Sequence, residues 1–138
     1  MKLLISPKGF PPGQGCKWET GLLKQILTIV GKIDPEAEIN YNIRDAIHIK
    51  PSKCKAFWLR IKTKQAEALE VICFCKKGQF NLERLEGLAP ETQLVISKPK
   101  IDDAQLHFTK IKDLDPIRVA KFLKEVREGL LSAFGMGG

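Results

Sequence analysis

The chain has 138 residues, the usual size of one domain, and carries a net charge of +7 from 23 basic and 16 acidic residues. Its 43% apolar and 28% charged residues are an ordinary globular balance, which excludes collagen-like, coiled-coil and wholly disordered classes. No apolar run reaches the roughly 18 residues of a membrane span, so we expect no integral membrane protein.

Residues 1–17 are expected to form a flexible arm. Residues 6–16 hold three prolines and three glycines, which can continue neither a helix nor a central strand. The apolar run Leu3–Ile5 is shorter than the core of a secretory signal, which needs about 7–15 residues, so we expect no leader.

The first predicted element is a helix from about residue 19 or 20 to Val30. Apolar residues recur there at helical spacing, and Gly31 is placed to end the helix. The expected buried stripe comprises Leu22, Leu23, Ile26, Leu27 and Val30. A turn at Asp34–Pro35 follows.

Alternating patterns predict the strands that come next. They fall at residues 39–42, 43–50, 56–64, 69–76, 92–97 and 104–111, with hairpin-type turns at 51–53 and 77–79 and a short helix at 81–86 that Asn81 can cap. The run 69–76 is apolar on nearly both faces, as in an inner strand covered on two sides. Asp102 and Asp103 are interpreted as a solvated pair in a turn.

The last element is a helix that Asp115 can cap and Pro116 can begin. Its predicted buried stripe is Val119, Phe122, Leu123, Val126 and Leu130. Short links between consecutive strands indicate an antiparallel meander. We therefore expect a single α+β domain over residues 18–138, with a sheet of about five or six strands and the N-terminal and C-terminal helices packed on one face.

The cysteines indicate a reducing compartment. They form no C-x-x-C pair, and Cys73 and Cys75 would share one face of a strand, where a disulfide rarely closes. A metal site there would need two more ligands, and the chain has only two histidines, His48 and His107. We expect four free thiols, no metal, no cofactor and a cytoplasmic location. The thiols are those of Cys16, Cys54, Cys73 and Cys75.

One predicted hairpin carries almost the entire charge excess. Residues 44–64 hold seven Lys and Arg against Asp45, which gives +6, whereas residues 65–138 hold 11 charges of each sign. Strand periodicity places Trp58 on one face together with Arg60, Lys62 and Lys64, and it places Phe57, Leu59 and Ile61 on the other. If the two strands pair, Arg44, His48 and Lys50 join the face of Trp58.

A face of this kind can bind a polyanion. Like charges on neighbouring strands repel, and phosphates laid over them relieve the repulsion and release counterions. Trp58 offers a stacking surface for an unpaired base. The expected binding residues for single-stranded or duplex nucleic acid, or another polyanion, are Arg44, His48, Lys50, Lys53, Lys55, Trp58, Arg60, Lys62 and Lys64. The alternative is a solvated face that protects an edge strand from aggregation.

Two further functions stay open. If helices cover only one face of the apolar strand Leu69–Cys75, a second copy of the chain would have to cover the other, which predicts a homodimer or a protein-interaction module. An enzyme is not expected, because neither histidine lies in a recognised motif with a nucleophile. A deep pocket that joins one of them to a carboxylate would favour an enzyme.

Three stretches together resemble a family of small uncharacterised α+β domains, found alone or fused to DNA-associated modules. They are the basic aromatic strand Ala56–Lys64, the inner strand and turn Leu69–Phe80, and the segment Ile111–Pro116 that leads into the last helix. The resemblance covers roughly residues 20–134. It implies the fold and an accessory or binding role, and it supplies no catalytic residues.

Overall fold

The computed structural model describes residues 18–19, 21–41, 46–52, 57–63 and 67–133, and the predicted arm at 1–17 lies outside them. The elements confirm the expected α+β class. In chain order they are α2 (Gly21–Ile33), β1 (Glu38–Asn40), β2 (Ala46–Lys50), β3 (Leu59–Lys62), β4 (Leu69–Lys76), α3 (Leu82–Leu85), β5 (Glu91–Val95), β6 (Ile101–Phe108), the 3-10 turn η1 (Ile111–Asp113) and α4 (Pro116–Ala133).

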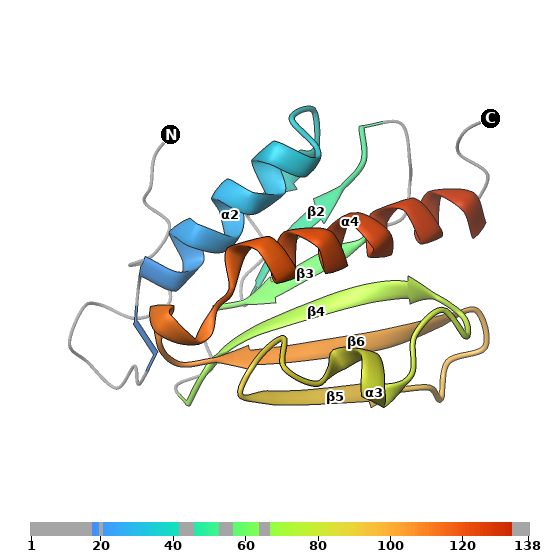
Figure 1. The fold of residues 1–138 in the computed structure, drawn as a ribbon. Helices are drawn as coiled ribbons and strands as arrows, with labels where there is room; N and C mark the ends of the chain where they lie inside the picture. Colours follow the sequence, from blue (N-terminus) through green and yellow to red (C-terminus); the bar gives the residue numbers. More distant parts are fainter. Residues whose placement is uncertain (1–17, 20, 42–45, 53–56, 64–66, 134–138) are drawn as a thin grey trace.

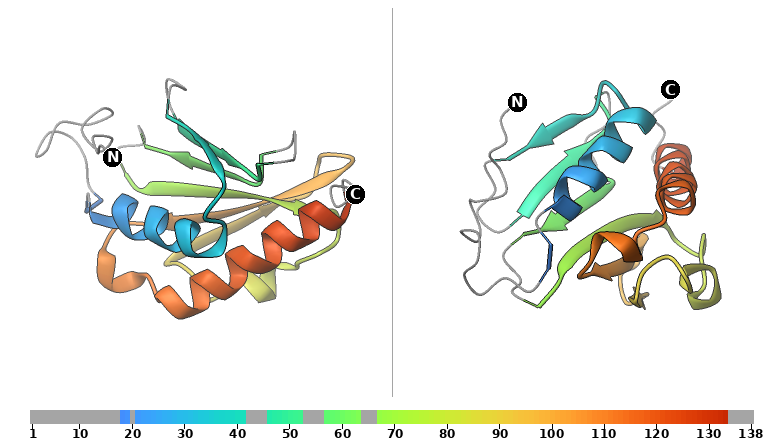
Figure 2. Two further views of the ribbon diagram at one scale, coloured as in Figure 1. Left: turned by 90° about the horizontal axis from the view of Figure 1, so that it is seen from above. Right: turned by 60° about the vertical axis from the view of Figure 1, so that its left-hand side comes forward.

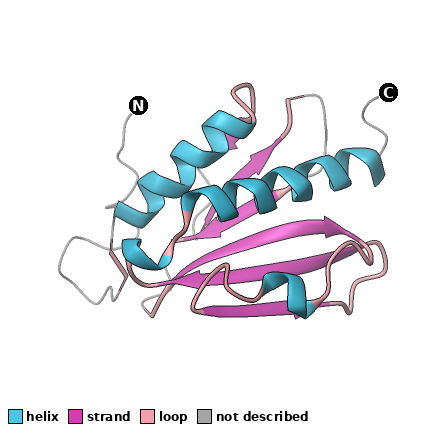
Figure 3. Ribbon diagram, viewed as in Figure 1, coloured by secondary structure: helices cyan, strands magenta, loops and turns pink. Residues whose placement is uncertain are grey.

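The six strands form one antiparallel sheet in the order β1-β2-β3-β4-β6-β5 (Figures 1 and 3). The first four strands are a meander, as predicted, whereas β6 inserts between β4 and β5. The long helices α2 and α4 lie on the same side of the sheet (Figure 2). On the opposite side, the described part of the chain places no helix. We call this side the open face; it carries Lys50, Arg60, Ile72, Phe74 and His107.

The helices form where the apolar periodicity predicts them. All five residues of the predicted stripe of α4 are buried, and the Asp115 carboxylate accepts hydrogen bonds from the N–H groups of Ile117 and Arg118 at 3.1 and 3.2 Å. The predicted end of α2 at Gly31 is wrong, because the helix continues to Ile33. Ile33 packs against the core, and this contact outweighs the low helix propensity of glycine.

The carboxylates of Asp102 and Asp103 are buried in β6, so their interpretation as a solvated turn pair is wrong. Each has a lysine partner: Lys77 Nζ lies 2.8 Å from Asp102 Oδ1, and Lys98 Nζ lies 3.0 Å from Asp103 Oδ2. A buried charge is tolerated when it is paired and hydrogen-bonded. The local alternation of apolar and polar residues does not show which distant side chain will pair with a given carboxylate.

Lys77 joins three segments of the chain. Besides its ion pair with Asp102, its ammonium group donates to the carbonyl oxygens of Ile96 and Lys98 at 2.6 and 2.7 Å. The Gly78 N–H also donates to Asp102 Oδ2 at 3.0 Å, and Gly78 adopts a positive φ of 79° in this turn. The cluster therefore fixes the β4–α3 turn to the β5–β6 connection.

We expect Asp102→Asn to destabilise the protein in a pH-dependent way. Burial raises the pKa of Asp102, but hydrogen bonds from Lys77 and Gly78 and the charge of Lys77 outweigh burial and hold that pKa below its usual value. The stabilisation is therefore complete above the unfolded-state pKa of about 3.9 and is lost as the pH falls further. Urea titration should show a loss of about 1–3 kcal/mol at pH 7 that shrinks below pH ~4.

Glu36→Gln, at an exposed position, is the matched control and should leave the free energy of unfolding unchanged. Equal stability of Asp102→Asn and the wild type at pH 7 would contradict the role of the Lys77 cluster.

Two features of the described residues bear on the expected class of protein. Neither α2 nor α4 combines the length and the apolar character that a membrane-spanning helix requires. No group of three or more histidine, cysteine or acidic side chains is arranged to hold a metal ion within the same residues.

Candidate functional site

Four of the predicted binding residues come together on the open face. The register between β2 and β3 sets His48 opposite Arg60. Lys50 lies two residues after His48 and Lys62 two residues after Arg60, so both lysines point to the same side of the sheet as His48 and Arg60. All four side chains are half-buried. We call His48, Lys50, Arg60 and Lys62 the basic cluster. The other predicted cations lie outside the described residues; they are Arg44, Lys53, Lys55 and Lys64.

Trp58 does not belong to the basic cluster, and its predicted exposure is wrong. The side chain is 0% exposed and lies in the helix-side core with Leu59 and Ile61. The cause is a break in the strand pairing: Leu59 is the register partner of Ile49, yet the Trp58 N–H also donates to the Ile49 carbonyl at 3.0 Å. Two successive residues thus oppose one, as in a β-bulge, and both side chains turn to the same side.

The bulge brings Phe57 to the open face in place of Trp58. Phe57 is half-buried, and its ring packs edge-on against the imidazole of His48, with centroids 4.7 Å apart and an interplanar angle of 71°. The sequence predicts Phe57 in the core because strict alternation puts Phe57 on the same face as Leu59 and Ile61. The run Phe57-Trp58-Leu59 contains three consecutive apolar residues, and that run was the available signal of a bulge.

We expect substitutions at the two aromatic positions to differ sharply in their effect on stability. Trp58→Ala removes the largest fully buried side chain and should lower the free energy of unfolding by about 3–5 kcal/mol. Phe57→Ala, one residue away on the half-buried side, should cost only about 1 kcal/mol. Urea denaturation followed by circular dichroism measures both. Equal losses would contradict the bulge.

Acidic side chains neutralise part of the basic cluster. Lys50 Nζ lies 2.8 Å from Glu38 Oε1, and Lys62 is the register partner of Glu70 on β4. The guanidinium carbon of Arg60 lies 5.7 Å from the centre of the Phe74 ring. The basic cluster therefore contains three cations, Lys50, Arg60 and Lys62, whose field is reduced by two neighbouring carboxylates.

The apolar residues of β4 on the open face are already covered. Ile72 is 4% exposed and Phe74 is 9% exposed, although no helix of the described chain lies over them. Arg60 and Lys98 extend over the Phe74 ring from the two sides, at 5.7 and 5.6 Å. Long cationic side chains can shield an apolar surface in this way. Covering this strand therefore does not require a second copy of the chain.

His48 differs from the other members of the basic cluster in its charge. Burial lowers the pKa of His48, and the charge of Arg60 lowers it further. The imidazole is therefore mainly neutral near pH 7, whereas Lys50, Arg60 and Lys62 stay charged. His48 thus contributes an aromatic ring and a hydrogen-bonding group to the surface, and not a fixed cation.

We expect His48 to titrate below the usual value of about 6.5 in an NMR pH titration. Because the unfolded chain binds this proton more readily, the stability of the fold should fall as the pH drops through the window below 6.5. Arg60→Gln should raise the pKa of His48 towards the usual value, and Lys62→Gln should change it less. An unshifted His48 in the wild type would contradict this assignment.

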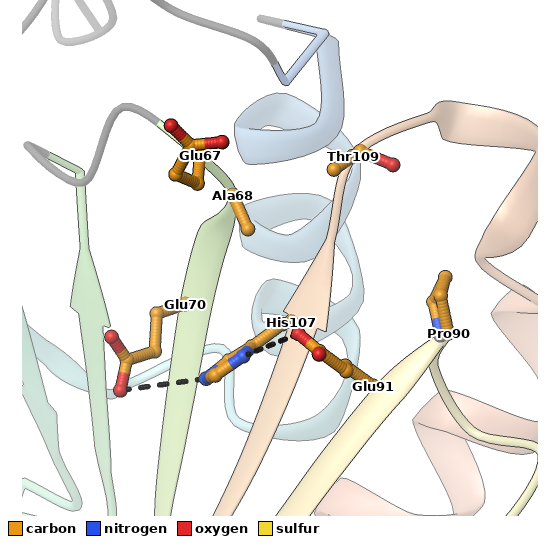
Figure 4. A pocket seen from close by; sticks show the side chains of 7 residues that line it. All are labelled: Glu67, Ala68, Glu70, Pro90, Glu91, His107 and Thr109. Carbon is orange, nitrogen blue, oxygen red and sulfur yellow. Dashed lines mark hydrogen bonds and ion pairs between the residues drawn. The ribbon is translucent and has the colours of Figure 1, made fainter.

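A second polar cluster surrounds His107 at the other half of the open face. His107 lies between two glutamates: its Nδ1 is 3.4 Å from Glu91 Oε1 on β5, and its Nε2 is 3.6 Å from Glu70 Oε2 on β4 (Figure 4). Together with Glu67, Ala68, Pro90 and Thr109 these residues line a pocket of about 320 Å³. Sequence reasoning missed the pocket because its imidazole and its carboxylates come from three separate segments, residues 67–70, 90–91 and 107–109.

The His107 pocket brings an imidazole and three carboxylates together, which are groups used in acid–base catalysis. The Glu91 side chain beside Nδ1 is 81% exposed, whereas the Glu70 side chain beside Nε2 is 15% exposed. Of the lining residues in the described chain, Thr109 alone carries a hydroxyl group. The thiols of Cys73 and Cys75 lie in the helix-side core. Burial raises the pKa of both, that of Cys75 to about 12, so they stay protonated and unreactive.

No protein-family model matches the chain, and neither the curated proteins nor the solved structures contain a match. The resemblance to a family of small α+β domains therefore stays a prediction that rests on residues 56–64, 69–80 and 111–116.

Proposed function

We propose that the protein is a non-catalytic accessory domain of the cytoplasm that binds nucleic acid, or another polyanion, through the basic cluster on the open face. One observation carries the proposal: the β2–β3 register brings Lys50, Arg60 and Lys62 onto one side of adjacent strands, where no helix of the described chain covers them. The cations would contact phosphates, and such contacts carry no sequence specificity.

The distribution of charge along the chain supports the same proposal. The two strands and their links contain seven of the 23 basic residues, so the excess charge of the whole chain comes from this region. Neighbouring cations on adjacent strands repel one another, so this clustering of charge does not stabilise the fold by itself. A bound polyanion would relieve the repulsion. Glu38 and Glu70 limit the attraction. We therefore expect weak, non-specific binding with a dissociation constant of about 1–100 µM at physiological salt.

Self-association through the open face is the weaker candidate. Self-association was expected because the apolar residues of β4 need cover on both sides. Arg60 and Lys98 already shield Phe74, so a second copy is not needed there. The buried free thiols Cys73 and Cys75 fit the proposed reducing location.

We expect the double substitution Lys50→Gln and Lys62→Gln to weaken the binding of a fluorescein-labelled 20-nucleotide single strand. Two lost phosphate contacts should reduce the slope of log K against log salt by about 1.4, and binding at low salt should weaken several-fold. Fluorescence anisotropy at a series of salt concentrations measures both quantities.

The matched control is Lys121→Gln with Lys124→Gln. It removes the same charge from exposed positions on α4, which lies on the opposite side of the sheet. This control should bind like the wild type. If both double variants bind with the same affinity and the same salt slope, the open face is not the binding surface. Wild-type protein that binds no polyanion at low salt contradicts the function itself.

A further inference from the structure

Cations of the basic cluster flank a small aromatic surface. The rings of His48 and Phe57 are in edge-to-face contact at 4.7 Å. Arg60 lies directly opposite His48 on the neighbouring strand, and Lys50 follows His48 by two residues on the same strand and the same side. An uncharged aromatic pair is thus flanked by cations on two strands.

The two rings of this pair carry no charge near pH 7, unlike the side chains of a surface that binds only phosphates. Burial and the charge of Arg60 both favour the neutral form of His48, so its ring adds no positive charge near pH 7. Phe57 adds no charge either. Its ring is only half-buried, so part of its apolar area stays in contact with water and does not contribute to stability. Neutral aromatic rings beside cations are the combination with which single-strand-binding proteins stack bases and hold the backbone.

From this arrangement we infer that the His48–Phe57 pair stacks against an unpaired base, so that the preferred ligand of the open face is single-stranded nucleic acid. The inference rests on the proposed function and narrows it. Bases in a duplex are stacked on one another, and a sheet face laid on a duplex meets mainly sugar and phosphate. A single strand presents free base faces to an aromatic ring and phosphates to Lys50 and Arg60 at the same time.

Three labelled probes of the same length test the inference: a 20-nucleotide oligothymidylate, a 20-base-pair duplex, and a 20-nucleotide abasic strand that keeps the phosphates and lacks the bases. The wild type should bind the oligothymidylate about tenfold more tightly than the abasic strand, as expected for one stacked base. It should also prefer the oligothymidylate to the duplex.

Variants at Phe57 identify the residue responsible. Phe57→Ala should bring the affinity for oligothymidylate down to that for the abasic strand, while Phe57→Tyr keeps a ring and should preserve the difference. The matched control is Leu82→Ala, which removes an exposed apolar side chain from α3 and should change nothing.

A spectroscopic readout separates stacking from a general loss of fold. Trp18 and Trp58 are both buried, so a tryptophan introduced by Phe57→Trp is a distinct, more exposed reporter. Its fluorescence should be quenched by oligothymidylate and not by the abasic strand. Wild-type fluorescence should change little with either probe.

The outcomes distinguish the two proposals. Equal affinity for the oligothymidylate and the abasic strand, with Phe57→Ala unchanged, overturns the stacking inference and leaves polyanion binding in place. Tighter binding of the duplex than of the oligothymidylate also overturns it. Failure of all three probes to bind overturns the proposed function, and the stacking inference with it.

Discussion

The hydrogen bond from the Trp58 N–H to the Ile49 carbonyl decides what each side of this sheet presents. Without it, strict alternation would run from Phe57 into β3, and the Trp58 indole would face solvent. With it, the phase changes by one residue, Trp58 fills the helix-side core, and Phe57 comes out beside His48. The bulge stabilises the domain through the burial of the indole, and it also determines the chemistry of the open face.

The two halves of the open face differ in charge. Lys50, Arg60 and Lys62 lie over β2 and β3, whereas Glu70 and Glu91 flank His107 over β4, β5 and β6. The Lys62–Glu70 register pair marks the border between the halves. A polyanion would be attracted along β2 and β3 and repelled by the carboxylates around His107, so its path should avoid the His107 pocket.

Periodicity predicted the fold well because a helix that packs on a sheet buries one stripe. All five stripe residues of α4 are buried, and both long helices lie on one side of the antiparallel sheet, as expected (Figure 2). Periodicity failed where a single local interaction overrides it. One hydrogen bond shifts the phase at Trp58, and two lysines make the burial of Asp102 and Asp103 possible. The His107 pocket combines groups from distant segments, which no local pattern contains.

The place of β6 between β4 and β5 has a consequence for the order of folding. The meander β1–β4 can pair as soon as its residues are synthesised, because each strand neighbours the previous one. β5 has no strand partner until β6 emerges from the ribosome, and α4, which covers the sheet, follows later still. The nascent chain therefore carries an unpaired β4 edge between the synthesis of β4 and that of β6, and an apolar sheet surface that α4 does not yet cover. This is the interval in which chaperone contact or misassembly would occur.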